Sequence, residues 1–150
     1  MVFKSFDLSV KDKIKNFSKV IVPDSDKSIS IRSFLLNSIA LDKAILRNVL
    51  ESDDVISTIK CLKQLGVKIK KIKNGKYIVF GRGLGSFYCK KGTNLNFGNS
   101  GTLARLIIGI LSTTPNINVK ITGDKSLNKR NMRKLISERE KFGANFFPLK

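Results

Sequence analysis

The sequence predicts an α/β (α+β) fold in which short strands alternate with amphipathic helices. Two observations support this prediction. Apolar residues at helical spacing follow short strand-like runs in regular order along the 150 residues. The order then restarts, because the same 73-residue offset separates Ser28 from Gly101 and Arg32 from Arg105. Both observations indicate an internal repeat of a βαβαββ-like unit, with about two units present.

The first unit, at about residues 19–81, begins with a strand predicted at Val20–Val22. Pro23 interrupts this strand, and the Asp and Ser residues that follow it are typical helix caps. A helix is therefore expected next, with its buried side formed by Ile31, Phe34, Leu35 and Ile39. The following apolar run, Ala44–Val49, is predicted as a second strand.

A second helix of this unit begins at Ser52–Asp54, where acidic side chains complement the helix dipole. Gly66 ends this helix, whose buried stripe is Val55, Ile59, Leu62 and Leu65. Val67–Lys73 alternates apolar and basic residues, as a half-exposed strand does. Asn74-Gly75 then predicts a hairpin turn into a return strand at Tyr77–Phe80.

The second unit, at about residues 93–150, repeats this order but is incomplete. Its strands are expected at Asn94–Phe97, Ile117–Thr122 and Asn145–Leu149. The first helix between them has the apolar stripe Leu103, Leu106, Ile107, Ile110 and Leu111. After a turn at Gly123-Asp124, a second helix contains Met132, Leu135 and Ile136. The incomplete second unit therefore indicates a fragment of a larger domain built from repeats.

The composition indicates a globular protein with an anionic partner. Hydrophobic residues make up 41% of the chain, and no apolar run approaches the ~20 residues that span a bilayer. A cytoplasmic location without a membrane partner is therefore expected. The net charge of +18 attracts anions. Scattered lysines are equally typical of a solvated surface, so both interpretations stay open.

The absence of histidine limits the chemistry that this chain can perform alone. Ser-His-Asp and Cys-His catalysis and histidine-ligated metal sites are excluded within it. Cys61 and Cys89 form no CxxC pair. The carboxylates of Glu51–Asp54 fit a helix cap better than a metal site. Acid–base chemistry must therefore use Lys, Asp, Glu, Tyr or Cys.

Three strand-to-helix junctions carry residue types that bind anions. The first contains Lys27 and Ser28 at a helix start, where unpaired N–H groups attract negative charge. Arg32 lies one helical turn further on and can reach the same anion. The second is Gly98–Thr102, whose small residues let the backbone approach a ligand closely. The third contains Arg130, which suits bidentate recognition of carboxylate or phosphate. Each junction alone also fits a structural role as a capped helix, a tight turn or a basic surface helix.

Together, these segments resemble the EPSP synthase family of enolpyruvyl transferases. Four patterns of the family have counterparts in this chain. Pro-Gly-Asp-Lys-Ser-Ile-Ser-x-Arg is similar to Pro23–Arg32, and Ser-Asp-Asp leading to Leu-Gly-Val is similar to Ser52–Val67. Gly-Asn-Ser/Ala-Gly-Thr with a following Arg is similar to Gly98–Arg105, and Gly-Asp-x-Ser-Leu-x-x-Arg-Pro-Met is similar to Gly123–Met132. The chain departs from the family by one extra residue before Asp26 and by Asn131 in place of Pro. Asn131 predicts a less rigid loop beside Arg130. Family members are also considerably longer, with the active site between two domains and a Ser-Ser-Gln phosphate-binding stretch that is absent here. The resemblance thus implies that residues 1–150 are a partial amino-terminal globular domain, with the second domain absent.

The resemblance implies a fold of the enolpyruvyl transferase type and a specific reaction. The enolpyruvyl group of phosphoenolpyruvate is transferred to the 5-hydroxyl of shikimate 3-phosphate, with release of phosphate, in chorismate and aromatic amino acid biosynthesis. It implies these two substrates as partners, no metal or organic cofactor, no nucleic acid, and a monomer at full length. Little or no turnover is expected from these 150 residues alone.

The resemblance also implies roles for individual residues of the first helix. Lys27 matches the family lysine that touches both substrates, and it is the catalytic candidate. It would neutralise charge and assist proton transfer. Ser28 and Arg32 match contacts to shikimate 3-phosphate.

The second unit supplies the remaining candidates for substrate binding. Gly101 matches the glycine beside phosphoenolpyruvate, in the region that glyphosate occupies, where a methyl group would crowd the bound molecule. Asn99 and Thr102 would shape this loop, and Arg130 matches an arginine that binds phosphoenolpyruvate.

Two alternatives belong to other substrate classes. The sister enolpyruvyl transferase that acts on UDP-N-acetylglucosamine has Lys-Asn where this chain has Lys27-Ser28, so the motif favours the shikimate enzyme. A basic nucleic-acid-binding module is the other alternative, in which the aromatic and basic residues of Phe87–Lys91 would contact bases and phosphates.

Overall fold

The computed structural model of the chain describes residues 7–11, 16, 18–21 and 23–147. The elements are, in order, α1 (Lys27–Ser38), β1 (Lys43–Leu46), α2 (Asp53–Gln64), β2 (Lys68–Lys73), β3 (Lys76–Phe80), β4 (Thr93–Asn96), α3 (Gly101–Leu111), β5 (Val119–Thr122), α4 (Lys125–Asn128) and α5 (Arg133–Glu140). β1, β3 and β2 form an antiparallel sheet in that order, and β4 pairs in parallel with β5. The predicted mixture of helices and short strands in an α/β fold is confirmed.

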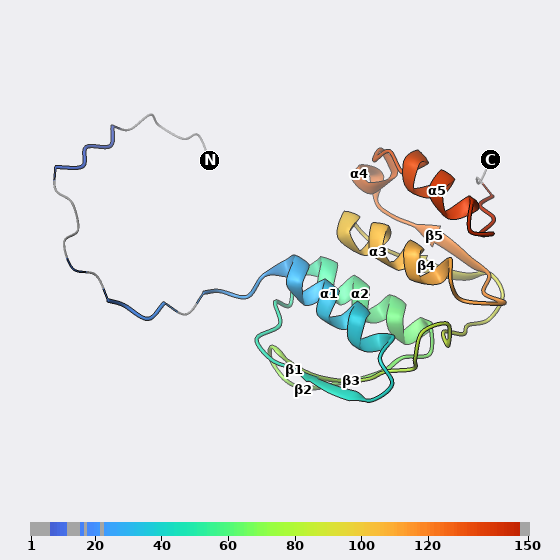
Figure 1. The fold of residues 1–150 in the computed structure, drawn as a ribbon, viewed down its shortest axis with the longest axis horizontal. Helices are drawn as coiled ribbons and strands as arrows, with labels where there is room; N and C mark the ends of the chain where they lie inside the picture. The colour runs from blue at the N-terminus through green and yellow to red at the C-terminus, as the bar shows by residue number, and fades with distance from the viewer. Residues whose placement is uncertain (1–6, 12–15, 17, 22, 148–150) are drawn as a thin grey trace.

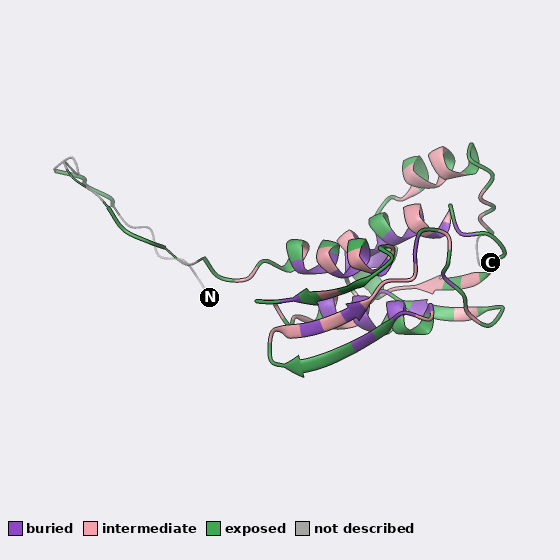
Figure 2. Ribbon diagram, turned by 60° about the horizontal axis from the view of Figure 1, so that its bottom comes forward, coloured by how far each residue is buried: buried purple, intermediate pink, exposed green. Residues whose placement is uncertain are grey.

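The helices α1 and α2 form a central layer (Figure 1). The three-stranded sheet lies on one side of them, and α3 with β4 and β5 lies on the other. Buried residues face this layer from both sides, whereas β2 is mostly exposed (Figure 2). Phe34 of α1 packs edge-on against Tyr77 of β3, with ring centroids 5.3 Å apart. The apolar stripes predicted for α1, α2 and α3 therefore form the core, with the exception of Leu106, which is 39% exposed on α3.

Local capping explains where the helices begin. The Asp26 carboxylate accepts a hydrogen bond from the Ile29 N–H at 2.6 Å, and Ser100 Oγ accepts one from the Leu103 N–H at 3.2 Å. Ser52 makes no such bond at the start of α2, where two acidic side chains in the first turn complement the dipole instead. The predicted starts of all three helices are confirmed.

Two predicted strands are absent from the described residues. Val20 and Ile21 are 91% and 71% exposed in a segment without strand pairing that leads away from the helices (Figure 1), and Val22 lies outside the described residues. Residues 145–147 also form no strand, and 148–149 lie outside the described residues. A strand needs a partner for its backbone hydrogen bonds, and the described part of the chain supplies none at either place.

Other boundaries differ from the prediction for local reasons. The strand expected at Ala44–Val49 ends at Leu46, because Asn48 adopts a φ of 56° that an extended strand cannot contain. The single turn α4 lies where the sequence predicted a turn at Gly123-Asp124 and, as the structural alternative for the Arg130 junction, a basic surface helix. It forms because the Asp124 carboxylate accepts a hydrogen bond from the Leu127 N–H at 2.7 Å.

Glu51 connects the β2–β3 hairpin to the loop before α2, and its ionisation should make stability depend on pH. Hydrogen bonds from the Lys71 ammonium and from the Gly75 N–H, at 2.8 Å, lower the pKa of Glu51 from 4.5 to about 2. Since the pKa is lower in the folded state, this stabilisation is complete above pH 4.5 and is lost as the pH falls towards about 2.

We expect the urea midpoint of the parent chain to fall across this pH range, and the midpoint of Glu51→Gln to fall less. Glu138→Gln, which removes a half-exposed carboxylate paired with Lys141 at the end of α5, is the control and should follow the parent. Equal pH dependence in the parent and in Glu51→Gln would show that these hydrogen bonds do not contribute.

Gly81, directly after β3, is packed against backbone and should not tolerate a side chain. A Cβ there would overlap the Ala40 carbonyl oxygen and lie 2.8 Å from the Asn37 carbonyl oxygen. Because backbone atoms cannot rotate away, we expect Gly81→Ala to destabilise the chain by about 1–3 kcal/mol. Gly109→Ala in α3, where no neighbouring atom lies within 4 Å of the added Cβ, should stabilise it by about 1 kcal/mol. Urea unfolding of both variants checks these opposite signs.

Candidate functional site

The amino termini of α1, α2 and α3 lie at the same end of the fold (Figure 1). We call this region, defined by Lys27, Asp54 and Gly101 in the first turns of these helices, the shared helix end. The first N–H groups of a helix lack partners within the helix and carry partial positive charge. Three helices that begin side by side therefore create a favourable place for an anion.

Two contacts connect the three helix starts through α2. The Lys27 ammonium lies 3.0 Å from the Asp54 carboxylate, which joins α1 to α2. One turn further along α2, a Cβ on Gly98 would lie 3.1 Å from Ser57 Oγ, so the loop before α3 lies against the same helix. The predicted Lys27 junction and the predicted Gly98–Thr102 turn are thus brought to one place.

Arg130 lies on the same turn, although it follows 31 residues after Asn99. Its Nη2 donates a hydrogen bond to Asn99 Oδ1 at 3.2 Å, and its guanidinium lies directly over Gly101. The Gly98 carbonyl oxygen accepts a hydrogen bond from the Asp124 N–H at 2.9 Å, which fixes the start of α4 beside the turn. The α4 turn thereby presents Arg130 at the shared helix end.

The remaining candidates lie on the first turns of the same helices. Ser28 is half-buried and Arg32 is exposed, and they share a face of α1 because they are four residues apart. Thr102 is half-buried in the first turn of α3. Among the described residues, none of the ion pairs involves Arg32 or Arg130. Their guanidinium groups are therefore available to a bound anion, and their contacts with substrates stay predictions.

Sequence reasoning missed the role of Asp54 at this end. Its position after Ser52 indicated only a helix cap, and the ion pair with Lys27 joins residues that are far apart in the sequence. Ser57 was missed for the same reason. No motif signals either contact, because both depend on how α1, α2 and α3 pack.

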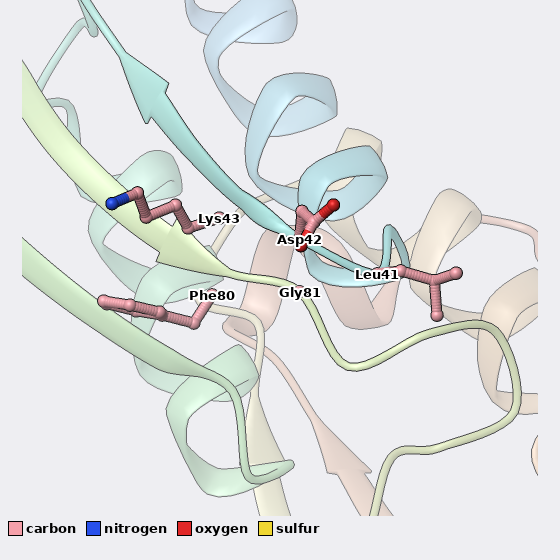
Figure 3. Close-up of a pocket in the computed structure, with 5 residues that line it drawn as sticks. All are labelled: Leu41, Asp42, Lys43, Phe80 and Gly81. Atoms are coloured by element: carbon pink, nitrogen blue, oxygen red, sulfur yellow. The ribbon is translucent and has the colours of Figure 1, made fainter.

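Two open pockets lie elsewhere. One is at the ends of β1 and β3 and is lined by Leu41, Asp42, Lys43, Phe80 and Gly81 (Figure 3). The other borders the segment before α1 and includes Asp26 and Arg47. Residues predicted to bind substrate line neither pocket. Within the described part of the chain, no three metal-ligating side chains gather, and no helix is long and apolar enough to cross a membrane.

Comparison with known proteins establishes the family. The model of the family EPSP synthase (3-phosphoshikimate 1-carboxyvinyltransferase) matches residues 11–147. The chain therefore belongs to the EPSP synthase family, and the resemblance drawn from its motifs is confirmed.

Individual relatives agree with this assignment. The chain is 38% identical over 136 residues to the 3-phosphoshikimate 1-carboxyvinyltransferase of Syntrophomonas wolfei, covering 91% of this chain and 31% of that protein. It is 44% identical over 140 residues to the enzyme of the same name from Endomicrobium trichonymphae, covering 92% and 32%. Its fold is similar to that of EPSP synthase from Acinetobacter baumannii, with a TM-score of 0.73 and 34% identity over 81% of this chain and 27% of that one. The chain thus spans about a third of the length of the curated relatives it matches.

Proposed function

We propose that a protein containing this chain transfers the enolpyruvyl group from phosphoenolpyruvate to the 5-hydroxyl of shikimate 3-phosphate. The observation that carries the proposal is the gathering of Lys27, the Gly98–Thr102 turn and Arg130 at the shared helix end. Both substrates are small and multiply anionic, which suits the partial positive charge and the basic side chains at this end. The matched relatives named 3-phosphoshikimate 1-carboxyvinyltransferase support the same reaction and disfavour the UDP-sugar and nucleic-acid alternatives.

The chemistry is an addition followed by an elimination. The 5-hydroxyl of shikimate 3-phosphate loses its proton as its oxygen bonds to the enol carbon, and a proton adds to the neighbouring methylene carbon, giving a tetrahedral intermediate. Cleavage of the bond to phosphate and loss of a proton then restore the double bond. Arg130 would bind an anionic group of phosphoenolpyruvate, and Lys27 would neutralise charge and assist proton transfer. Ser28 and Arg32 would hold shikimate 3-phosphate. Such preorganised charges act chiefly by electrostatic stabilisation.

The same proposal extends to the whole protein. Addition and elimination need only charges and proton transfers, so we include no metal or organic cofactor. We also propose that the full-length protein is a cytoplasmic monomer. Since the chain spans about a third of its relatives, groups beyond it would complete the site, and we propose negligible turnover by the chain alone.

The experiment is an acceptor comparison with a full-length protein that contains this chain. Phosphate release and product formation from phosphoenolpyruvate are measured with shikimate 3-phosphate and, separately, with UDP-N-acetylglucosamine. We expect transfer only to shikimate 3-phosphate. Transfer to the UDP-sugar instead, or tight binding of single-stranded DNA with a steep salt dependence and no transfer, would overturn the proposal.

A further inference from the structure

One ion pair among the described residues involves the proposed catalytic residue. Lys27 Nζ lies 3.0 Å from Asp54 Oδ2, whereas the Lys71–Glu51 pair secures a hairpin and the Lys141–Glu138 pair lies at the carboxyl end of α5. The two partners differ in exposure, since the Asp54 side chain is 17% exposed and the Lys27 side chain is 48% exposed. Asp54 is therefore the more buried partner of this ion pair.

The structure fixes the backbone of Asp54 in the first turn of α2. Asp54 is the second residue of α2, where the helix dipole favours a negative charge. The next residue, Val55, is completely buried, and the Asp54 carbonyl oxygen accepts a hydrogen bond from Thr58 Oγ1 at 2.8 Å. Because an Asp side chain is short, the backbone of α2 sets where its carboxylate lies.

The electrostatic environment of the Lys27 ammonium is unfavourable without a nearby carboxylate. Lys27 is the first residue of α1, and a cation at a helix amino terminus is electrostatically unfavourable. The starts of α2 and α3 add further positive partial charge at the shared helix end, and the chain carries a net charge of +18. A flexible lysine in this field would turn its ammonium towards solvent unless a carboxylate held it.

We infer that Asp54 is a positioning residue that holds the Lys27 ammonium at the shared helix end for the reaction proposed above. This inference rests on the proposed function and adds a residue to it. Asp54 acts through Lys27 and does not itself bind the substrates, since its negative charge would repel them. Loss of its charge would leave the substrate groups intact and misplace the ammonium, and misplacement of this kind costs up to about 100-fold in rate.

The test in a full-length protein is a double-mutant cycle between the two residues. Asp54→Asn keeps the side-chain shape and removes the charge, and Asp53→Asn is the matched control, because Asp53 is exposed in the same turn. We expect Asp54→Asn to lower kcat/KM about 10- to 100-fold, and Asp53→Asn to change it less than about twofold. In the Lys27→Met background, Asp54→Asn should have no further effect, because its partner is already gone. An equal loss in both backgrounds would overturn the inference.

A second measurement needs no turnover and separates failure of the inference from failure of the proposed function. In the 150-residue chain, ¹³C relaxation at the Lys27 Cε reports how far the side chain is held. Asp54→Asn is expected to make this carbon more mobile, and Asp53→Asn to leave it unchanged. Unchanged mobility in Asp54→Asn would overturn the inference, whether or not the full-length protein transfers enolpyruvyl groups.

Discussion

Arg130→Ala, in a full-length protein that contains this chain, is expected to lower kcat/KM for enolpyruvyl transfer by about 100- to 1,000-fold. The guanidinium lies over Gly101 at the start of α3, and Asn99 Oδ1 accepts a hydrogen bond from it at 3.2 Å. The group is therefore oriented before an anion binds, and a planar guanidinium can bind a carboxylate or phosphate with two hydrogen bonds. Steady-state kinetics with both substrates measure the loss.

Arg133→Ala is the matched control for this prediction. Arg133 is also exposed, but it is the first residue of α5, and the described contacts do not connect it to the Gly98–Thr102 turn. We expect its kcat/KM to stay close to that of the parent. If Arg130→Ala loses less than about threefold, or if both variants lose equally, Arg130 does not act as proposed.

Gly101→Ala is expected to raise the KM for phosphoenolpyruvate by about tenfold or more, because it moves Arg130. A Cβ at Gly101 would overlap Arg130 Nη1 and lie 3.3 Å from Arg130 Cζ. The overlapped atoms are the far end of a flexible side chain, so the guanidinium is expected to move away from Asn99 while the backbone stays in place. The methyl group would thus displace a binding group, in addition to crowding the bound molecule.

Stability and binding together distinguish this mechanism from a folding defect. Gly101→Ala should unfold at nearly the same urea concentration as the parent, and Gly109→Ala, in the same helix, should keep the parent KM while it stabilises α3. An unchanged KM in a folded Gly101→Ala protein would refute the predicted displacement of Arg130.

Sequence reasoning succeeded where the determining interactions are local. Asp26, Ser100 and Asp124 each cap a helix within three residues of themselves. The alternation predicted along β2 holds at Ile69, which is buried, and fails at Ile72, which is 49% exposed at a register shift in the pairing with β3. The strand predicted at Val20–Val22 is absent at the described residues Val20 and Ile21, because pairing requires a distant partner. An apolar pattern shows that a segment can form a strand, but it does not show which other strand lies beside that segment.

In the candidate site, too, local features were predicted and contacts between distant elements were not. The motifs indicated which residues stand at helix starts, but the Lys27–Asp54 and Arg130–Asn99 contacts depend on the packing of separate elements. Asn131 was predicted to loosen the loop after Arg130. In the structure, its Oδ1 accepts a hydrogen bond from the Arg133 N–H at 2.9 Å, so a hydrogen bond constrains the backbone where a proline ring would have done so.

The most direct test of the shared helix end is an amide NMR titration of the 150-residue chain with shikimate 3-phosphate and phosphoenolpyruvate. Anions held by the three helix starts should perturb the amides of Lys27, Ser28, Gly98–Thr102 and Arg130 together, with one common affinity for each ligand. Perturbations that instead follow the lysines of β2 and β3, or that reach only one of the three helix starts, would contradict the proposal that these residues form one anion site.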